Sequence, residues 1–83
     1  MKMYTIINET TLERIDGYCA SAQPIVAEVE EVLYTQWELT PCTNRCSWAY
    51  PFLRGEKVRF SFHGTNTVLV WQDATGTIRV KDI

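Results

Sequence analysis

The chain lacks any hydrophobic run long enough to cross a membrane. Its longest apolar stretches, such as Val68 to Trp71, are far shorter than the roughly 20 residues that a membrane-spanning helix needs. The first residues also lack the apolar stretch and the small-residue cleavage site of a signal peptide. We therefore expect a cytoplasmic protein that does not enter the membrane.

Cysteine and histidine are scarce. The cysteines Cys19, Cys42 and Cys46 are odd in number and unevenly spaced, which does not suit a disulfide framework, so reduced thiols are expected. Together with His63, the single histidine, they would supply four zinc ligands. Structural zinc sites usually draw on paired close spacings, however, and only Cys42 and Cys46 form such a pair. We expect neither a metal nor a cofactor.

No catalytic motif is present either. A cysteine nucleophile needs a neighbouring base and a positive environment that lowers the pKa of its thiol. Arg45 stands beside Cys46, but the sequence places no base next to them, and no pair of carboxylates is distinctive. The sequence therefore predicts a protein that is not an enzyme.

The length and the charge distribution limit the architecture and the partners. With 83 residues, the chain suffices for one hydrophobic core, which predicts a single domain over residues 1–83. Residues 1–41 carry seven acidic and two basic side chains, whereas residues 42–83 carry three acidic and six basic ones. An acidic protein of net charge -2 with this asymmetry is expected to have charged partners.

The first half of the chain predicts a strand and two helices. Residues 3–7 are rich in Tyr, Thr and Ile, which favours a strand. Thr10 and Glu13 have the spacing of a capping box, and apolar residues follow at helical intervals, which predicts a helix over residues 11–20. A second helix is expected from Pro24 to about Trp37; a single helix kinked near residues 21–24 is the alternative.

Residues 39–56 predict an irregular segment, because Pro41, Pro51 and Gly55 break regular structure. A loop of this length in a small domain is either functional or contains a short element. Residues 47–53 are the candidate for that element, as a strand ending at Pro51.

The last third predicts three antiparallel strands. A two-residue turn at Gly64 and Thr65 and a four-residue loop over residues 73–76 agree on one register. In that register the apolar face holds Val58, Phe60, Phe62, Leu69, Trp71, Ile78 and Val80, and the opposite face holds Lys57, Arg59, Ser61, His63, Val68, Val70, Gln72, Thr77, Arg79 and Lys81. The predicted fold is α+β in the order β-α-α-β-β-β, with an antiparallel sheet, residues 3–7 at its edge, and helices on one face.

The leading functional hypothesis is a protein-binding inhibitor or adaptor that occupies a surface of a larger complex, including a phage-type inhibitor of a host defence system. Trp, Tyr and Arg dominate binding energy at interfaces and crowd into residues 47–54, while three glutamates give the expected second helix an acidic face. One or two of the aromatic residues should cap the core and at least one should stay exposed. The expected partner-binding residues are Glu28, Glu30, Glu31, Trp48, Tyr50, Phe52 and Arg54.

The alternative hypothesis is single-stranded nucleic-acid binding through a basic sheet face formed by Lys57, Arg59, Arg79 and Lys81. Two features disfavour it. The predicted register turns Phe60, Phe62 and Trp71 into the core, and the net charge of the chain is negative.

Overall fold

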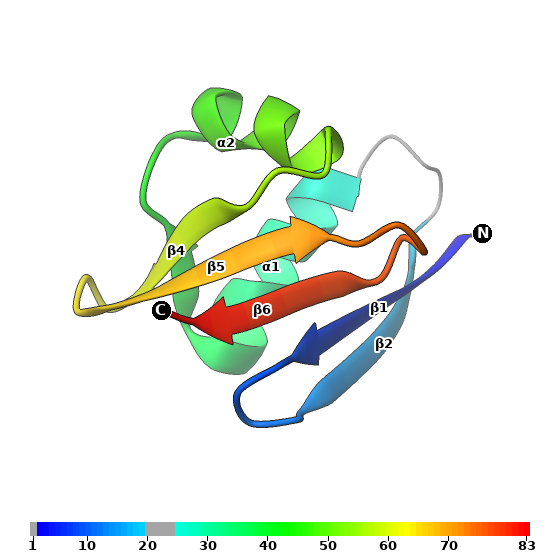
Figure 1. The fold of residues 1–83 in the computed structure, drawn as a ribbon, viewed down its shortest axis with the longest axis horizontal. Coiled ribbons are helices and arrows are strands. Elements are labelled where there is room, and N and C mark those ends of the chain that lie inside the picture. Colours follow the sequence, from blue (N-terminus) through cyan, green and yellow to red (C-terminus); the bar gives the residue numbers. More distant parts are fainter. Residues whose placement is uncertain (1, 20–24) are drawn as a thin grey trace.

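A computed structural model, which describes residues 2–19 and 25–83, shows a curled six-stranded sheet with two helices (Figure 1). The elements are β1 (Lys2–Asn8), β2 (Arg14–Cys19), α1 (Ile25–Trp37), β3 (Leu39–Pro41), α2 (Arg45–Leu53), β4 (Val58–Phe62), β5 (Asn66–Gln72) and β6 (Ile78–Asp82). The strand order is β2-β1-β6-β5-β4-β3. The α+β class is confirmed, but the sheet is mixed because β1 runs parallel to β6.

The N-terminal strand is confirmed, but the helix predicted over residues 11–20 is wrong. Residues 14–19 of that segment form β2, which pairs with β1, so β1 lies inside the sheet and not at its edge. The side-chain oxygen of Asn8 accepts hydrogen bonds from the backbone N–H groups of Thr10 and Thr11 at 2.8 and 3.0 Å. An Asn side chain that binds nearby N–H groups stabilises a tight turn, and this turn replaces the predicted helix start.

Helix α1 is confirmed, and its apolar stripe packs as the spacing predicts. Val26, Val29 and Leu33 are buried and Trp37 packs against the same core. Pro24 as the first helical residue and a kink over residues 21–24 both lie outside the described residues.

The segment between α1 and β4 contains two short elements, β3 and α2, and the strand considered over residues 47–53 is wrong. Asn44 caps α2, since its side chain accepts a hydrogen bond from the Ser47 N–H at 2.9 Å. The helix ends in a Schellman motif: Gly55 has a φ of 87°, and the Glu56 N–H donates to the Pro51 carbonyl at 3.0 Å. Pro51 lies in the last part of this helix and does not end it.

The three C-terminal strands form, but β5 faces the opposite way from the prediction. Phe60 pairs with Val68, and Val70 pairs with Val80, so each connecting turn contains one residue more than predicted. A shift of one residue reverses the face of every side chain in a strand. Val68 and Val70 are therefore buried, while Leu69 and Trp71 lie on the other face. The two shifts cancel for β4 and β6, so Val58, Phe60, Ile78 and Val80 are buried as predicted, whereas Phe62 is 39% exposed.

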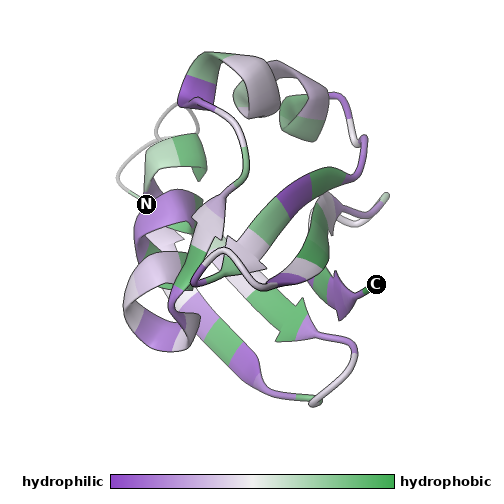
Figure 2. Cartoon of the chain, turned by 90° about the vertical axis from the view of Figure 1, so that its left-hand side faces the viewer, coloured by the Kyte–Doolittle hydropathy of each residue, from purple (hydrophilic) through white to green (hydrophobic). Residues whose placement is uncertain are grey.

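One face of the sheet, called the inner face here, is covered by both helices. Its buried residues form one cluster with Val29 and Leu33 of α1 and with Trp48 and Phe52 of α2. The Trp48 ring packs edge-on against Phe60, with ring centroids 5.1 Å apart. Hydrophobic and hydrophilic residues alternate along β4 and β6, so that their apolar side chains point to the inner face (Figure 2). Within the described residues, no helix has the length and apolar content that crossing a membrane requires.

Candidate functional site

The outer face of the sheet is open, and no helix lies in front of it in Figure 1. Its residues alternate with the buried ones along each strand, and they are partly or fully exposed. Strand pairing places Arg79 between Trp71 on β5 and Ile7 on β1, and places Leu69 between Arg59 on β4 and Lys81 on β6. Cationic and apolar side chains therefore alternate across neighbouring strands of this face.

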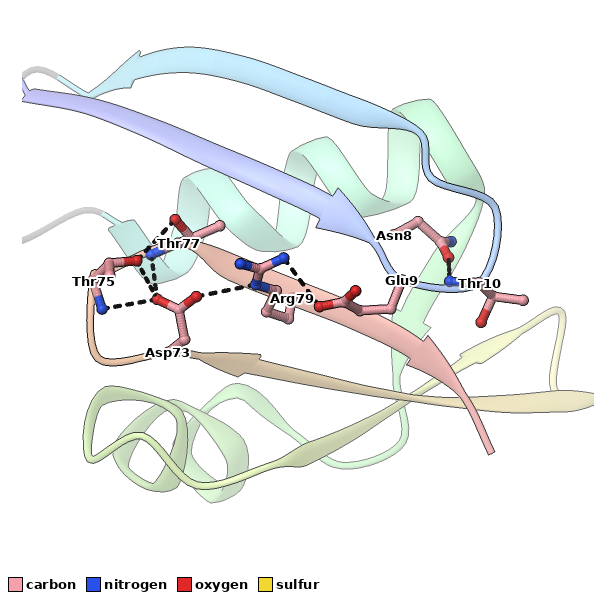
Figure 3. Close-up of polar contacts among 7 residues, drawn as sticks. All are labelled: Asn8, Glu9, Thr10, Asp73, Thr75, Thr77 and Arg79. Carbon is pink, nitrogen blue, oxygen red and sulfur yellow. Dashed lines mark hydrogen bonds and ion pairs between the residues drawn. The ribbon is translucent and has the colours of Figure 1, made fainter.

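Arg79 is held by carboxylates on both sides (Figure 3). It forms ion pairs of 3.0 Å with Glu9 and with Asp73. The Asp73 carboxylate also accepts hydrogen bonds from the Thr75 hydroxyl and from the N–H groups of Thr75 and Thr77. The Thr75 hydroxyl bond, supported by Arg79 and these N–H groups, lowers the pKa of Asp73 to about 2. The hydrogen bond to Asp73 also raises the pKa of Arg79. The charge of Arg79 is therefore neutralised by carboxylates of the same chain.

Three other cations of the outer face have no such partner. Lys57, Arg59 and Lys81 form none of the ion pairs recorded within residues 2–19 and 25–83. The ammonium of Lys57 lies 4.9 Å from the centroid of the Trp71 ring, in a cation–π contact. The sequence predicts one basic face that contains Lys57, Arg59, Arg79 and Lys81, and the structure separates Arg79 from the other three.

The predicted partner-binding residues lie on the other side of the molecule, and the structure divides them. Trp48 and Phe52 are 2% and 0% exposed, so both belong to the core, while Tyr50 is 67% exposed and points away from it. The expectation that some of these aromatics cap the core and one stays exposed is confirmed. Arg54 is exposed and forms an ion pair with Glu56 at 2.8 Å.

The three glutamates of α1 also differ. Glu28 accepts a hydrogen bond from the Tyr4 hydroxyl at 3.0 Å, and Glu30 forms an ion pair with Arg45 at 3.0 Å. Glu31 is exposed and takes part in no ion pair recorded among the described side chains. Burial of Tyr4, helped by the Glu28 carboxylate, raises the pKa of the Tyr4 hydroxyl to about 12.

A shallow groove of about 270 Å³ lies between α1, β3 and the start of α2. Tyr34, which is 59% exposed, lies along it with Glu30, Glu31 and Arg45. Arg45, the first residue of α2, is the residue of that helix that lines the groove.

The cysteines and the histidine are not brought together as a site. Cys19 is buried in β2, whereas Cys42 and Cys46 are exposed thiols that form no disulfide with each other. His63 Nε2 lies 2.9 Å from a carboxylate oxygen of Glu38, and both side chains are exposed. No group of three or more Asp, Glu, His or Cys side chains suited to a metal ion occurs in the part of the chain that the structure describes.

Comparison with known proteins gives no assignment. No family model, no curated protein and no solved structure matches this chain. Function is therefore inferred from the two surfaces described above.

Proposed function

We propose that this protein is a non-enzymatic binding protein that acts as an inhibitor or adaptor by occupying a surface of a larger protein. Its contact surface is the helical side, defined as Glu31 and Tyr34 of α1 and Tyr50 and Leu53 of α2. The observation that carries the proposal is the 67% exposure of Tyr50 on a helix that two buried aromatic residues anchor. A tyrosine held on a rigid element offers a large contact area at a low entropic cost.

The rest of the helical side supports this proposal. Leu53 and Tyr34 are 52% and 59% exposed, and apolar area of this kind is the usual centre of a protein interface. The unpaired carboxylate of Glu31 beside the groove complements a basic partner surface, which would select that partner and speed its association. No feature of the fold singles out a phage-type inhibitor of a host defence system within this class.

One further observation favours binding over catalysis. His63, the single histidine, is engaged by Glu38 at an exposed position, where a general base would be solvated. We also propose a cytoplasmic location, where reducing conditions would keep the exposed thiols of Cys42 and Cys46 unlinked.

An affinity capture experiment from host lysate tests the proposal. The bait is the wild-type protein, and the variants are Tyr50→Ala and Glu31→Lys, each of which changes an exposed side chain. We expect a partner captured by the wild type to be lost, or strongly reduced, with both variants. Trp48→Ala is not a suitable probe, since Trp48 is a core residue and its loss would reduce binding through unfolding.

The matched control is Tyr18→Ala. Tyr18 is 64% exposed, close to the value for Tyr50, but it lies on the outer face of β2. The partner should be retained with Tyr18→Ala. If the wild type captures no protein, or if Tyr18→Ala and Tyr50→Ala behave alike, the proposed contact surface is wrong.

A further inference from the structure

The cations without a carboxylate partner gather in one place on the outer face. Among the described side chains, Arg14, Arg45, Arg54 and Arg79 all form ion pairs, and Lys57, Arg59 and Lys81 do not. All three lie around Leu69 and Trp71 of β5: Arg59 and Lys81 are the strand neighbours of Leu69, and Lys57 lies over Trp71. We call these five residues the cation cluster.

This clustering is unexpected for an acidic chain. The sequence has ten acidic and eight basic side chains, so carboxylates are in excess, yet within residues 2–19 and 25–83 none is recorded in an ion pair with these three cations. Two strand spacings, about 10 Å, separate Arg59 from Lys81, and like charges at that distance still repel at moderate ionic strength. A bound anion with several charges along its length would turn this repulsion into attraction.

The Trp71 ring adds a second recognition element. Leu69 and Trp71 project from the same face of β5, which is partly exposed, so the cations surround an apolar and aromatic surface. An aromatic ring on an open sheet face can stack a nucleic-acid base, with the surrounding cations meeting the phosphates. A base that stacks on Trp71 would displace the Lys57 ammonium, which could then contact a phosphate.

We propose that the cation cluster binds single-stranded nucleic acid, with phosphates at Lys57, Arg59 and Lys81 and one base stacked on Trp71. The acidic helix α1, with its three glutamates, lies on the opposite side of the sheet, so the negative net charge of the chain does not describe this face. The proposal is independent of the helical side. An adaptor needs two separate contact surfaces, and the molecule offers one on each side.

The first experiment measures fluorescence anisotropy of a labelled oligothymidylate of about ten nucleotides, at about 50 and about 200 mM salt. Three phosphate contacts to a single strand predict a slope of about -2 when the logarithm of the affinity is plotted against the logarithm of the salt concentration. Binding should therefore be about 20-fold weaker at the higher concentration. Arg59→Ala should weaken binding and make this slope shallower by about 0.7. The matched control is Arg54→Ala, which removes the same charge from the helical side and should leave binding unchanged.

The second experiment tests stacking. Trp71→Leu should weaken binding by about fivefold or more, and Trp71→Phe should lie closer to the wild type because it keeps a ring. If Trp71→Leu does not fold, quenching by oligothymidylate of the fluorescence of a Trp37→Phe protein decides, since Trp48 is buried and Trp71 is accessible.

Several results would overturn the proposal. One is the absence of salt-dependent binding, and another is an equal loss for Arg54→Ala and Arg59→Ala. Efficient competition by poly-L-glutamate, with no effect of Trp71→Leu and no quenching, would assign the cation cluster to an acidic protein instead. A failure of any of these tests leaves the capture result for Tyr50→Ala unaffected, so the two proposals fail separately.

Discussion

The ring of Tyr4 lies over Gly17, its partner across strands β1 and β2. A Cβ atom at Gly17 would collide with the end of the Tyr4 side chain, so the ring occupies the space that any other residue at this position would need. From there the Tyr4 hydroxyl reaches Glu28 of α1 at 3.0 Å. This one side chain therefore joins both N-terminal strands to the helix that covers them.

Gly17→Ala should destabilise the protein. Replacing a strand glycine by alanine normally stabilises by roughly 0.5–1 kcal/mol, because glycine loses more backbone entropy on folding. Here the collision with a buried ring should outweigh that gain, with a cost of about 1–3 kcal/mol. Urea denaturation measures the difference in the free energy of unfolding. An unchanged or raised stability would show that the Tyr4 ring does not occupy this space.

The Tyr4 hydroxyl should ionise well above the ordinary pKa of a tyrosine, which is 10.0. The pKa of Tyr4 is raised to about 12 by burial and by Glu28, so the folded state favours the protonated hydroxyl. The resulting stability is complete below about pH 10 and is lost as the pH rises through about 12. Absorbance near 295 nm during alkaline titration should show the late step, and Tyr4→Phe should remove it. A late step that persists in Tyr4→Phe would contradict this assignment.

The two sides of α2 should respond differently to truncation. Trp48→Ala should cost about 3–5 kcal/mol, because it empties part of the core. Tyr50→Ala should change stability by less than about 0.5 kcal/mol, because its side chain points into solvent. Thermal or urea unfolding compares the two variants. Equal losses would mean that residues 45–53 do not form the helix described.

Asp73 should contribute to acid resistance. Its pKa is lowered to about 2 from an ordinary value of 3.8, so its contribution to stability is present above about pH 4 and is lost as the pH falls toward 2. Because the Thr75 hydroxyl is the largest cause, Thr75→Val should raise the pKa of Asp73 toward its ordinary value while keeping its charge. Carbon NMR of the carboxyl group during acid titration measures this pKa. No shift in Thr75→Val would refute the loop geometry.

The elements that follow from local apolar spacing could be predicted from the sequence. The stripe formed by Val26, Val29 and Leu33 defines α1, and the inward faces of β4 and β6 were assigned correctly. Segment 11–20 was assigned wrongly because Thr10 and Glu13 resemble a helix start, while the features that favour a strand are the Asn8 turn and the contact between Tyr4 and Gly17. The Asn8 turn is a local feature of the sequence, whereas the contact between Tyr4 and Gly17 forms only in the folded protein.

The errors in α2 and β5 arise from turn and cap chemistry that the sequence does contain. Asn44 favours the start of a helix and Gly55 favours its end. Pro51, which lies between them, was interpreted as a residue that prevents a helix. His63 adopts a φ of 50°, a conformation in which histidine is enriched, and this adds one residue to the turn before β5. The sequence predicts Lys57, Arg59 and Lys81 on one basic face. It does not predict that Arg79 is neutralised while these three are not, because which cations find carboxylate partners depends on tertiary packing.

Site-directed photo-crosslinking tests the proposed function most directly. A photoreactive p-benzoylphenylalanine replaces Tyr50 in one protein and Tyr18 in another, two positions of similar exposure on opposite sides of the molecule. After irradiation in host lysate, we expect a defined protein adduct from the Tyr50 position and none from the Tyr18 position. A protein adduct from the Tyr18 position alone would contradict the account, because it would place the protein partner on the outer face of the sheet.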